Sequence, residues 1–170
     1  DFTVWMSDIF TLQDALDMIC KVGQLVEKEP KATTIATNIS NSFSQLPALY
    51  FSKPTAAYFI WRKPFMAAAK DTFIDNMLQK AGFTNVFNHL CRYPEINPLQ
   101  LHSANPDFIF LSSEPYPFKQ KHIAELQEIC PLSKILLVDG ELFSWYGSRL
   151  VKSAAYFLEL RKLVSKFFIS

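Results

Sequence analysis

Short apolar runs alternate with amphipathic stretches through the last two thirds of the chain, and no other feature of the sequence limits its fold as strongly. The runs at 56–61, 107–111 and 135–138 are largely apolar and rich in aromatic and branched residues, which is typical of strands buried on both faces. Strands that alternate with helices build βαβ units. We therefore predict an α/β fold in which a mostly parallel sheet lies between two layers of helices.

Helical periodicity and end signals place the other elements. Thr11 and Asp14 form a capping-box pattern at the start of a first helix. A second helix begins near Pro30 and continues to Leu46, and the two prolines within 46–55 indicate a linker. The remaining predicted elements are helices at 71–81 (begun by Asp71 and ended by Gly82), 98–104, 119–129 and 148–166 and a very short strand at 85–87.

Composition and missing motifs exclude several classes of function. The 170 residues, of which 49% are apolar, suffice for a buried core. A net charge of +1 without a basic stripe argues against nucleic-acid binding, and no apolar run approaches the ~18 residues that insert into a membrane. The four glycines form no phosphate-binding or dinucleotide motif, and a serine nucleophile motif is absent. Because residues 1–8 do not resemble a signal peptide, we expect any export signal to have been removed or to lie outside the chain.

The cysteines and histidines show no pattern of a metal or redox site. We expect all three cysteines, at positions 20, 91 and 130, to be buried as small apolar residues. The three histidines share no metal-ligand spacing and are expected at the surface or as capping groups, with His122 in a charged helical turn. In the same turn, Lys121 and Glu125 are placed to form a weak ion pair. We predict no metal site.

Aromatic and charged residues gather in the segments that follow the predicted strands. If the strands are parallel, these segments share the edge at which open α/β sheets bind ligands. The candidate binding residues are Trp61, Arg62, Phe65, Tyr93, Glu114, Tyr116, Glu141, Phe143, Trp145 and Tyr146. Such an edge suits a large, flat, partly apolar ligand with polar rim groups. Two alternatives stay open: the aromatic residues cap the core, or Glu114 and Glu141 form a carboxylate pair for acid–base chemistry.

Several motifs resemble one family of transport proteins. They are AGFTNVF at 81–87, NPDFI at 105–109, SSEPYPF at 112–118 and DGELFSWYGSR at 139–149. Together with the text around Tyr93, they are similar to cluster-A (helical-backbone, class III) periplasmic substrate-binding proteins of ABC importers, and most of all to the vitamin B12-binding, or corrinoid-binding, subgroup. The resemblance runs through nearly the whole chain.

This resemblance implies two α/β lobes joined by one long rigid helix, with the ligand in the cleft between them. Residues 1–29 would be a remnant of the N-terminal lobe and a helix, 30–55 the connecting helix and linker, and 56–170 the C-terminal lobe, so that most of the first lobe is missing. Phe65 and Tyr93 match aromatic positions that face the corrin ring. Glu141 matches an acidic rim position, whereas Trp145 stands where those proteins have a polar or basic group.

The resemblance also implies a role in binding and delivery, without catalysis and without an intrinsic cofactor. The ligand would be cobalamin or another metal chelate, the location periplasmic or otherwise extracytoplasmic and membrane-anchored, and the partner an ABC transporter permease. Family members dock on the permease through a surface glutamate, whose place holds Leu99, with Glu95 nearby.

Two alternative functions and one question of assembly remain at this stage. A ferric siderophore or haem would use Arg62, Arg92 and Arg149. A small hydrolase would use Glu114 and Glu141. A single lobe with an exposed apolar face is also expected to self-associate.

Overall fold

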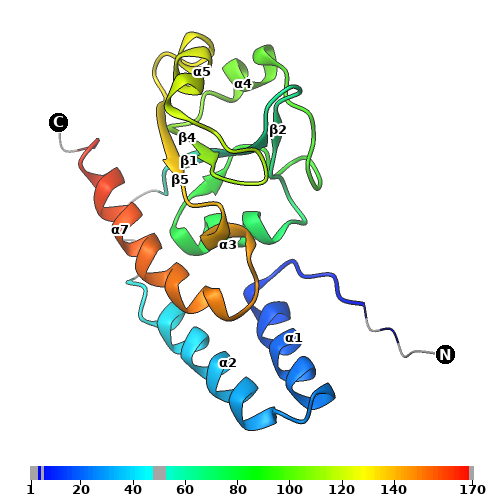
Figure 1. Ribbon diagram of the computed structural model, residues 1–170. Helices are drawn as coiled ribbons and strands as arrows, with labels where there is room; N and C mark the ends of the chain where they lie inside the picture. The colour runs from blue at the N-terminus through cyan, green and yellow to red at the C-terminus, as the bar shows by residue number, and fades with distance from the viewer. Residues whose placement is uncertain (1–3, 5, 48–52, 169–170) are drawn as a thin grey trace.

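The computed structural model describes residue 4 and residues 6–47 and 53–168, and its centre is a mixed sheet (Figure 1). Strands β1 (Thr55–Trp61), β4 (Phe108–Ser112) and β5 (Lys134–Val138) are parallel neighbours in the order β1-β4-β5. The short β3 (Thr84–Asn85) also pairs with β1 in parallel, and β2 (Met66–Ala67) pairs with it antiparallel. The predicted α/β fold with a mostly parallel sheet is confirmed.

Helices cover both faces of this sheet. Alternate residues of β1 enter opposite cores: Tyr58 packs in one apolar cluster and Phe59 in the other. Helices α3 (Phe73–Ala81) and α7 (Ser153–Ser165) contribute to the first cluster, whereas α4 (Pro98–Ala104) and α5 (Ile123–Ile129) contribute to the second. Figure 1 shows the two pairs of helices on opposite sides of the strands, so the predicted three-layer arrangement is present.

Two antiparallel helices precede the sheet, and the second of them lies between the first and α7 (Figure 1). In α1 (Leu12–Leu25), the predicted capping box is present: Asp14 N–H donates to Thr11 Oγ1, and Thr11 N–H donates to the Asp14 carboxylate. α2 (Glu29–Ser44) has Pro30 in its first turn, as predicted. The two helices approach so closely that a Cβ on Gly23 would lie 2.3 Å from that of Ala32. Of the predicted linker, residues 48–52 lie outside the described residues.

Arg161 ties the exit of α2 to the α/β unit. Its guanidinium donates to the carbonyl oxygens of Lys80 and Ala81, at the end of α3, and to that of Pro47. The three donor–acceptor distances are 2.7–2.8 Å. Because the guanidinium is charged, these are among the stronger hydrogen bonds that a side chain can make.

Some element boundaries differ from those predicted. Thr72, not Asp71, caps α3, because the Thr72 hydroxyl accepts the N–H of Asp75 while Asp71 has a left-handed backbone. Gly82 ends α3 in the left-handed conformation, as predicted. The two last predicted helices begin as 3₁₀ turns, η1 (Gln120–His122) and η2 (Ser148–Lys152). Neither β2 nor the one-turn helix α6 (Glu141–Ser144) was predicted, because both are too short for a periodic pattern.

Candidate ligand-binding surface

The segments after β1, β4 and β5 leave the sheet at one edge because the three strands are parallel and aligned. Backbone hydrogen bonds hold these segments to their neighbours: Ser113 N–H donates to Val138 O at 3.0 Å, and Tyr116 N–H to Ile60 O at 3.3 Å. The sheet therefore brings together three of the four strand-following segments that the sequence singled out, at the edge where such sheets bind ligands.

Five aromatic residues gather along this edge, and we call them the aromatic surface: Trp61, Tyr93, Tyr116, Trp145 and Tyr146. Trp61 packs edge-on against Tyr116 with ring centroids 5.7 Å apart. Trp145 and Tyr146 line one hollow of about 470 Å³, and Tyr146 and Tyr93 line a second. Apart from half-buried Tyr116, each is 37–50% exposed, which leaves ring surface for contact with a ligand.

Two predicted contact residues lie elsewhere. Phe143 has no exposed surface and packs in the core, with its ring centroid 5.0 Å from that of Tyr58 and 4.8 Å from that of Phe157. It faces inward because α6 turns one side toward the sheet, so it cannot contact a ligand in this structure. Phe65 is half-buried against Phe59 and lines a separate hollow with Lys63, Pro64, residues 95–98 and Gln100.

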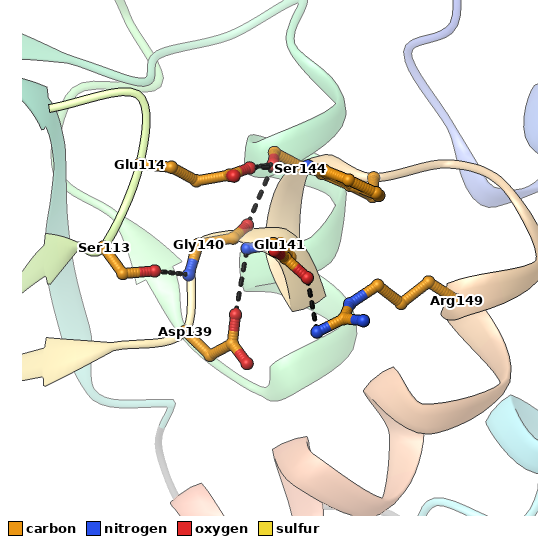
Figure 2. Close-up of polar contacts among 8 residues, drawn as sticks. Ser113, Glu114, Asp139, Gly140, Glu141, Ser144 and Arg149 are labelled. Carbon is orange, nitrogen blue, oxygen red and sulfur yellow. Dashed lines mark hydrogen bonds and ion pairs between the residues drawn. The ribbon is translucent and has the colours of Figure 1, made fainter. Parts of the chain in front are cut away.

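Glu114 orients Trp145. Its carboxylate oxygen Oε1 accepts the Trp145 indole N–H at 2.7 Å. The same oxygen accepts the Ser144 hydroxyl at 2.9 Å (Figure 2). This contact links the segment after β4 to the segment after β5, and the same β4 segment carries Tyr116, which packs on Trp61. The segment after β4 therefore links Trp61, through Tyr116, to Trp145, through Glu114.

Glu141 has a different partner. Its carboxylate forms an ion pair with Arg149 (Figure 2), whose guanidinium also lies over the Trp145 ring, 5.8 Å from the centroid. Figure 2 shows Glu114 and Glu141 directed to separate partners. Because each carboxylate is held by its own partners within the chain, we expect both residues to orient their neighbours.

The arginines near the edge are neutralised by neighbouring acidic groups. Arg62 Nε donates to Glu125 at 2.8 Å, and this hydrogen bond raises the pKa of Arg62. The predicted pairing of Glu125 with Lys121 is replaced by this contact. Arg92 lies 3.6 Å from Asp8 and 5.2 Å from the ring centroid of Phe10. With Arg149 bound to Glu141, each of the three arginines has an acidic partner within the chain.

The N-terminal segment also lines the surface, which the sequence did not indicate. Ser7, Asp8 and Ile9 line the hollow that holds Tyr93 and Tyr146, and Met18 of α1 lines the one that holds Trp145. Phe73 packs against Tyr146, with ring centroids 5.7 Å apart. These residues are remote in sequence from the strand ends, and a strand-by-strand reading could not find them. Burial of the Tyr93 phenol raises its pKa.

The cysteines and histidines depart partly from expectation. Cys130 is buried, but Cys91 is exposed and Cys20 is half-buried. His89 and His102 are exposed, as predicted for surface groups, and His122, which is only 5% exposed, caps η1 by accepting the Lys119 N–H, the other role expected of the histidines. Within the described residues, no cluster of three His, Cys, Asp or Glu side chains has the geometry to bind a metal ion. The helices of that same part of the chain include none with the length and apolarity to cross a membrane.

Gly140 is required by close packing beneath Glu114. A Cβ at this position would lie 2.3 Å from Ser112 Oγ and 2.7 Å from Glu114 Cγ, so Gly140→Ala must displace the segment after β4. We expect this variant to lower the free energy of unfolding by about 1–3 kcal/mol, as overpacking does. Gly147→Ala is the matched control, because nothing lies within 4 Å of its added Cβ. Equal denaturation midpoints for the two variants would contradict the predicted contact.

Several solved structures share this fold. No protein-family model matches the sequence, and no curated protein matches it. A possible iron-binding periplasmic solute-binding protein from Staphylococcus epidermidis has 20% identity and a TM-score of 0.76, covering 92% of this chain and 64% of that one. A periplasmic heme-binding protein from Roseiflexus sp. RS-1 has 14% identity and a TM-score of 0.77, covering 91% and 64%. The periplasmic vitamin B12-binding protein of Vibrio cholerae has 15% identity and a TM-score of 0.67, covering 97% and 67%.

These similarities show a shared fold. The chain has the α/β architecture of one part of periplasmic binding proteins and spans about 64% of the length of the first two. Sequence identities of 14–20% are too low to assign a ligand or a function to this chain.

Proposed function

We propose that this chain is the C-terminal lobe and connecting helix of an extracytoplasmic substrate-binding protein that delivers a metal chelate to the permease of an ABC importer. The observation that carries the proposal is the aromatic surface, which lies at the carboxyl edge of the parallel strands. The fold supports it, because the solved structures that share this fold include proteins described as binding iron, heme and vitamin B12.

The surface would bind by burying a flat ligand against the aromatic rings. Trp61, Tyr93, Trp145 and Tyr146 provide exposed ring area, and aromatic contacts of this kind give large apolar burial at little cost in side-chain entropy. The polar groups between the rings, Glu114 and the Glu141–Arg149 pair, would hold the rim of the ligand. No covalent step and no intrinsic cofactor is required, so we propose a binding protein rather than an enzyme.

We propose that the other wall of the cleft comes from residues outside this chain. The chain spans about 64% of two structurally similar proteins, and its aromatic surface is open. Residues 1–29 would then belong to the end of the first lobe and a helix, 30–55 to the connector and linker, and 56–170 to the second lobe. The three contacts of Arg161 would set the direction in which α2 leaves this lobe.

The charges at the edge favour a corrinoid over anionic chelates. Each nearby arginine already has an acidic partner, so none of the three offers an unpaired guanidinium to a carboxylate-bearing haem or siderophore. A corrin ring carries neutral amides at its rim, which can hydrogen-bond to both carboxylates and guanidinium groups. Haem or a ferric siderophore is the alternative, supported by the heme-binding and iron-binding proteins of the same fold.

Calorimetric titration tests this proposal. Cobalamin, cobinamide, haemin and a ferric hydroxamate would each be titrated into this chain and into a longer version that carries a first lobe. We expect saturable heat with the corrinoids, and stronger binding in the longer version because two walls bury more ligand surface. Heat with haemin or the ferric hydroxamate alone would reject the corrinoid in favour of the alternative. No heat with any chelate in either protein would reject the proposed function.

A further inference from the structure

A buried histidine supports the aromatic surface from below. His122 is 5% exposed and lies at the end of η1, just before α5. Its ring packs against Tyr116 and Phe118, with centroids 5.5 Å and 5.7 Å away. Tyr116 in turn packs on Trp61. His122 therefore lies directly behind one end of the surface, separated from Trp61 by a single ring.

The hydrogen bonds of His122 fix its neutral form. The backbone N–H of Lys119 donates to Nδ1 at 2.9 Å, so Nδ1 must carry a lone pair and no proton. The proton of the neutral ring is then on Nε2, which lies 3.4 Å from the Tyr116 hydroxyl and can donate to it. Protonation of Nδ1 would replace the acceptor with a donor that faces the Lys119 N–H. One backbone bond would be lost and two N–H groups would oppose each other.

The charged groups around His122 also favour its neutral form. Burial lowers the pKa of His122, and the cations Arg62, Lys121 and Lys119 lower it further, while Glu125 alone opposes them. Glu125 is itself bound to Arg62. The imidazole is thus neutral at neutral pH, and the charged form that appears on acidification is poorly accommodated.

We propose that neutral His122 is the positioning residue that holds Tyr116 against Trp61, and that protonation of His122 at acidic pH loosens this end of the aromatic surface and weakens chelate binding. The effect on ligand affinity rests on the proposed function, whereas the effect on the Tyr116–Trp61 contact does not. Ligand affinity would then fall at acidic pH without any chemical change in the ligand itself.

The sign of the effect follows from the lowered pKa. The unfolded chain binds a proton at His122 below the ordinary value of about 6.5, whereas the folded chain resists protonation until a lower pH. The stabilising contribution of neutral His122 is therefore complete above about pH 6.5 and is lost as the pH falls through the folded pKa. Contacts that depend on the neutral ring are lost over the lower part of the same window.

Two readouts test the proposal separately. The first is ¹⁹F NMR of the ligand-free chain labelled with 5-fluorotryptophan, with the Trp61 signal assigned by Trp61→Phe. On acidification from about pH 8 to about pH 4.5, we expect this signal to move with the midpoint of His122, measured by imidazole NMR, below about 6.5. The second is calorimetric titration of cobalamin, for which we expect about two- to tenfold weaker binding at the acidic end, the effect of one lost hydrogen bond.

Variants at position 122 decide between a switch and a merely structural role. In His122→Gln, the amide can still donate to the Tyr116 hydroxyl but cannot titrate, so we expect the pH dependence of the Trp61 signal and of the affinity to disappear, whatever their values at neutral pH. The control His102→Gln changes an exposed histidine bound to the Ile129 carbonyl and should keep the wild-type pH profile. The proposal would be overturned if His122→Gln kept the wild-type pH profile. It would also be overturned if the Trp61 signal did not change with the protonation midpoint of His122. Absence of cobalamin binding at every pH, with the Trp61 response intact, would instead reject the proposed ligand.

Discussion

Phe143→Ala is expected to lower the free energy of unfolding by about 3–5 kcal/mol, the cost of truncating a fully buried phenylalanine. Phe143 has no exposed surface and packs against Tyr58, Phe110 and Phe157. These residues belong to three different elements, β1, β4 and α7, so the cavity would open at the centre of one face of the sheet. Surroundings tied to so many elements cannot collapse easily to fill it.

The measurement is chemical denaturation followed by circular dichroism. Phe143→Leu should lose less than the alanine variant, because most of the volume is retained. The matched surface control is Tyr146→Ala, three residues further on and 43% exposed, for which we expect a much smaller loss. A loss below about 1 kcal/mol for Phe143→Ala would show that Phe143 is not a core residue and would restore it as a candidate for ligand contact.

Trp61→Ala and Tyr93→Ala are each expected to weaken chelate binding at least about tenfold, which corresponds to ~1.4 kcal/mol. Both rings are exposed at the carboxyl edge, and a large aromatic contact that becomes buried by a ligand is typical of residues that dominate binding. The loss should be greatest in a protein with both walls of the cleft, where the rings are buried most completely.

Calorimetry with the tightest-binding chelate measures this loss. Leu132→Ala is the control: Leu132 is 79% exposed but precedes β5, at the opposite end of the strand from the aromatic surface. The Leu132→Ala variant should bind the chelate with the affinity of the wild type. Unchanged affinity in both Trp61→Ala and Tyr93→Ala, with folding intact, would remove the aromatic surface as the binding site.

The sheet and its carboxyl edge were accessible from sequence because they depend on local patterns. The run at 107–111 is apolar enough to be a buried strand wherever it lies, and β4 (Phe108–Ser112) is displaced from it by a single residue. The helix predicted at 98–104 coincides with α4. Asn97 caps this helix in a capping box with Gln100, and Pro98 is in its first turn. Parallel pairing then follows from strand–helix alternation, and with it the common edge.

The orientation of single side chains was not accessible in the same way. Phe143 and Trp145 are two residues apart in an aromatic segment, yet one is buried in the core and the other is 50% exposed. Only the one-turn helix α6 decides which of them faces inward. The same applies to Glu125, whose pairing with Arg62 spans 63 residues of sequence, and to His122, whose burial depends on Tyr116 and Phe118 folding over it.

The proposed self-association of the lobe remains a prediction that depends on the same surface. An open aromatic edge without its second wall is an exposed apolar patch of the kind that proteins bury by association. If the surface is the cause, a saturating chelate should shift the chain toward the monomer.

A crystal structure of the protein with its tightest-binding chelate tests the central claim most directly. We predict that the chelate lies at the carboxyl edge of β1, β4 and β5, with its flat face against Trp61, Tyr93, Trp145 or Tyr146 and its rim near Glu114 and the Glu141–Arg149 pair. A chelate bound instead in the hollow lined by Lys63, Phe65 and Gln100, or elsewhere away from this edge, would contradict the account.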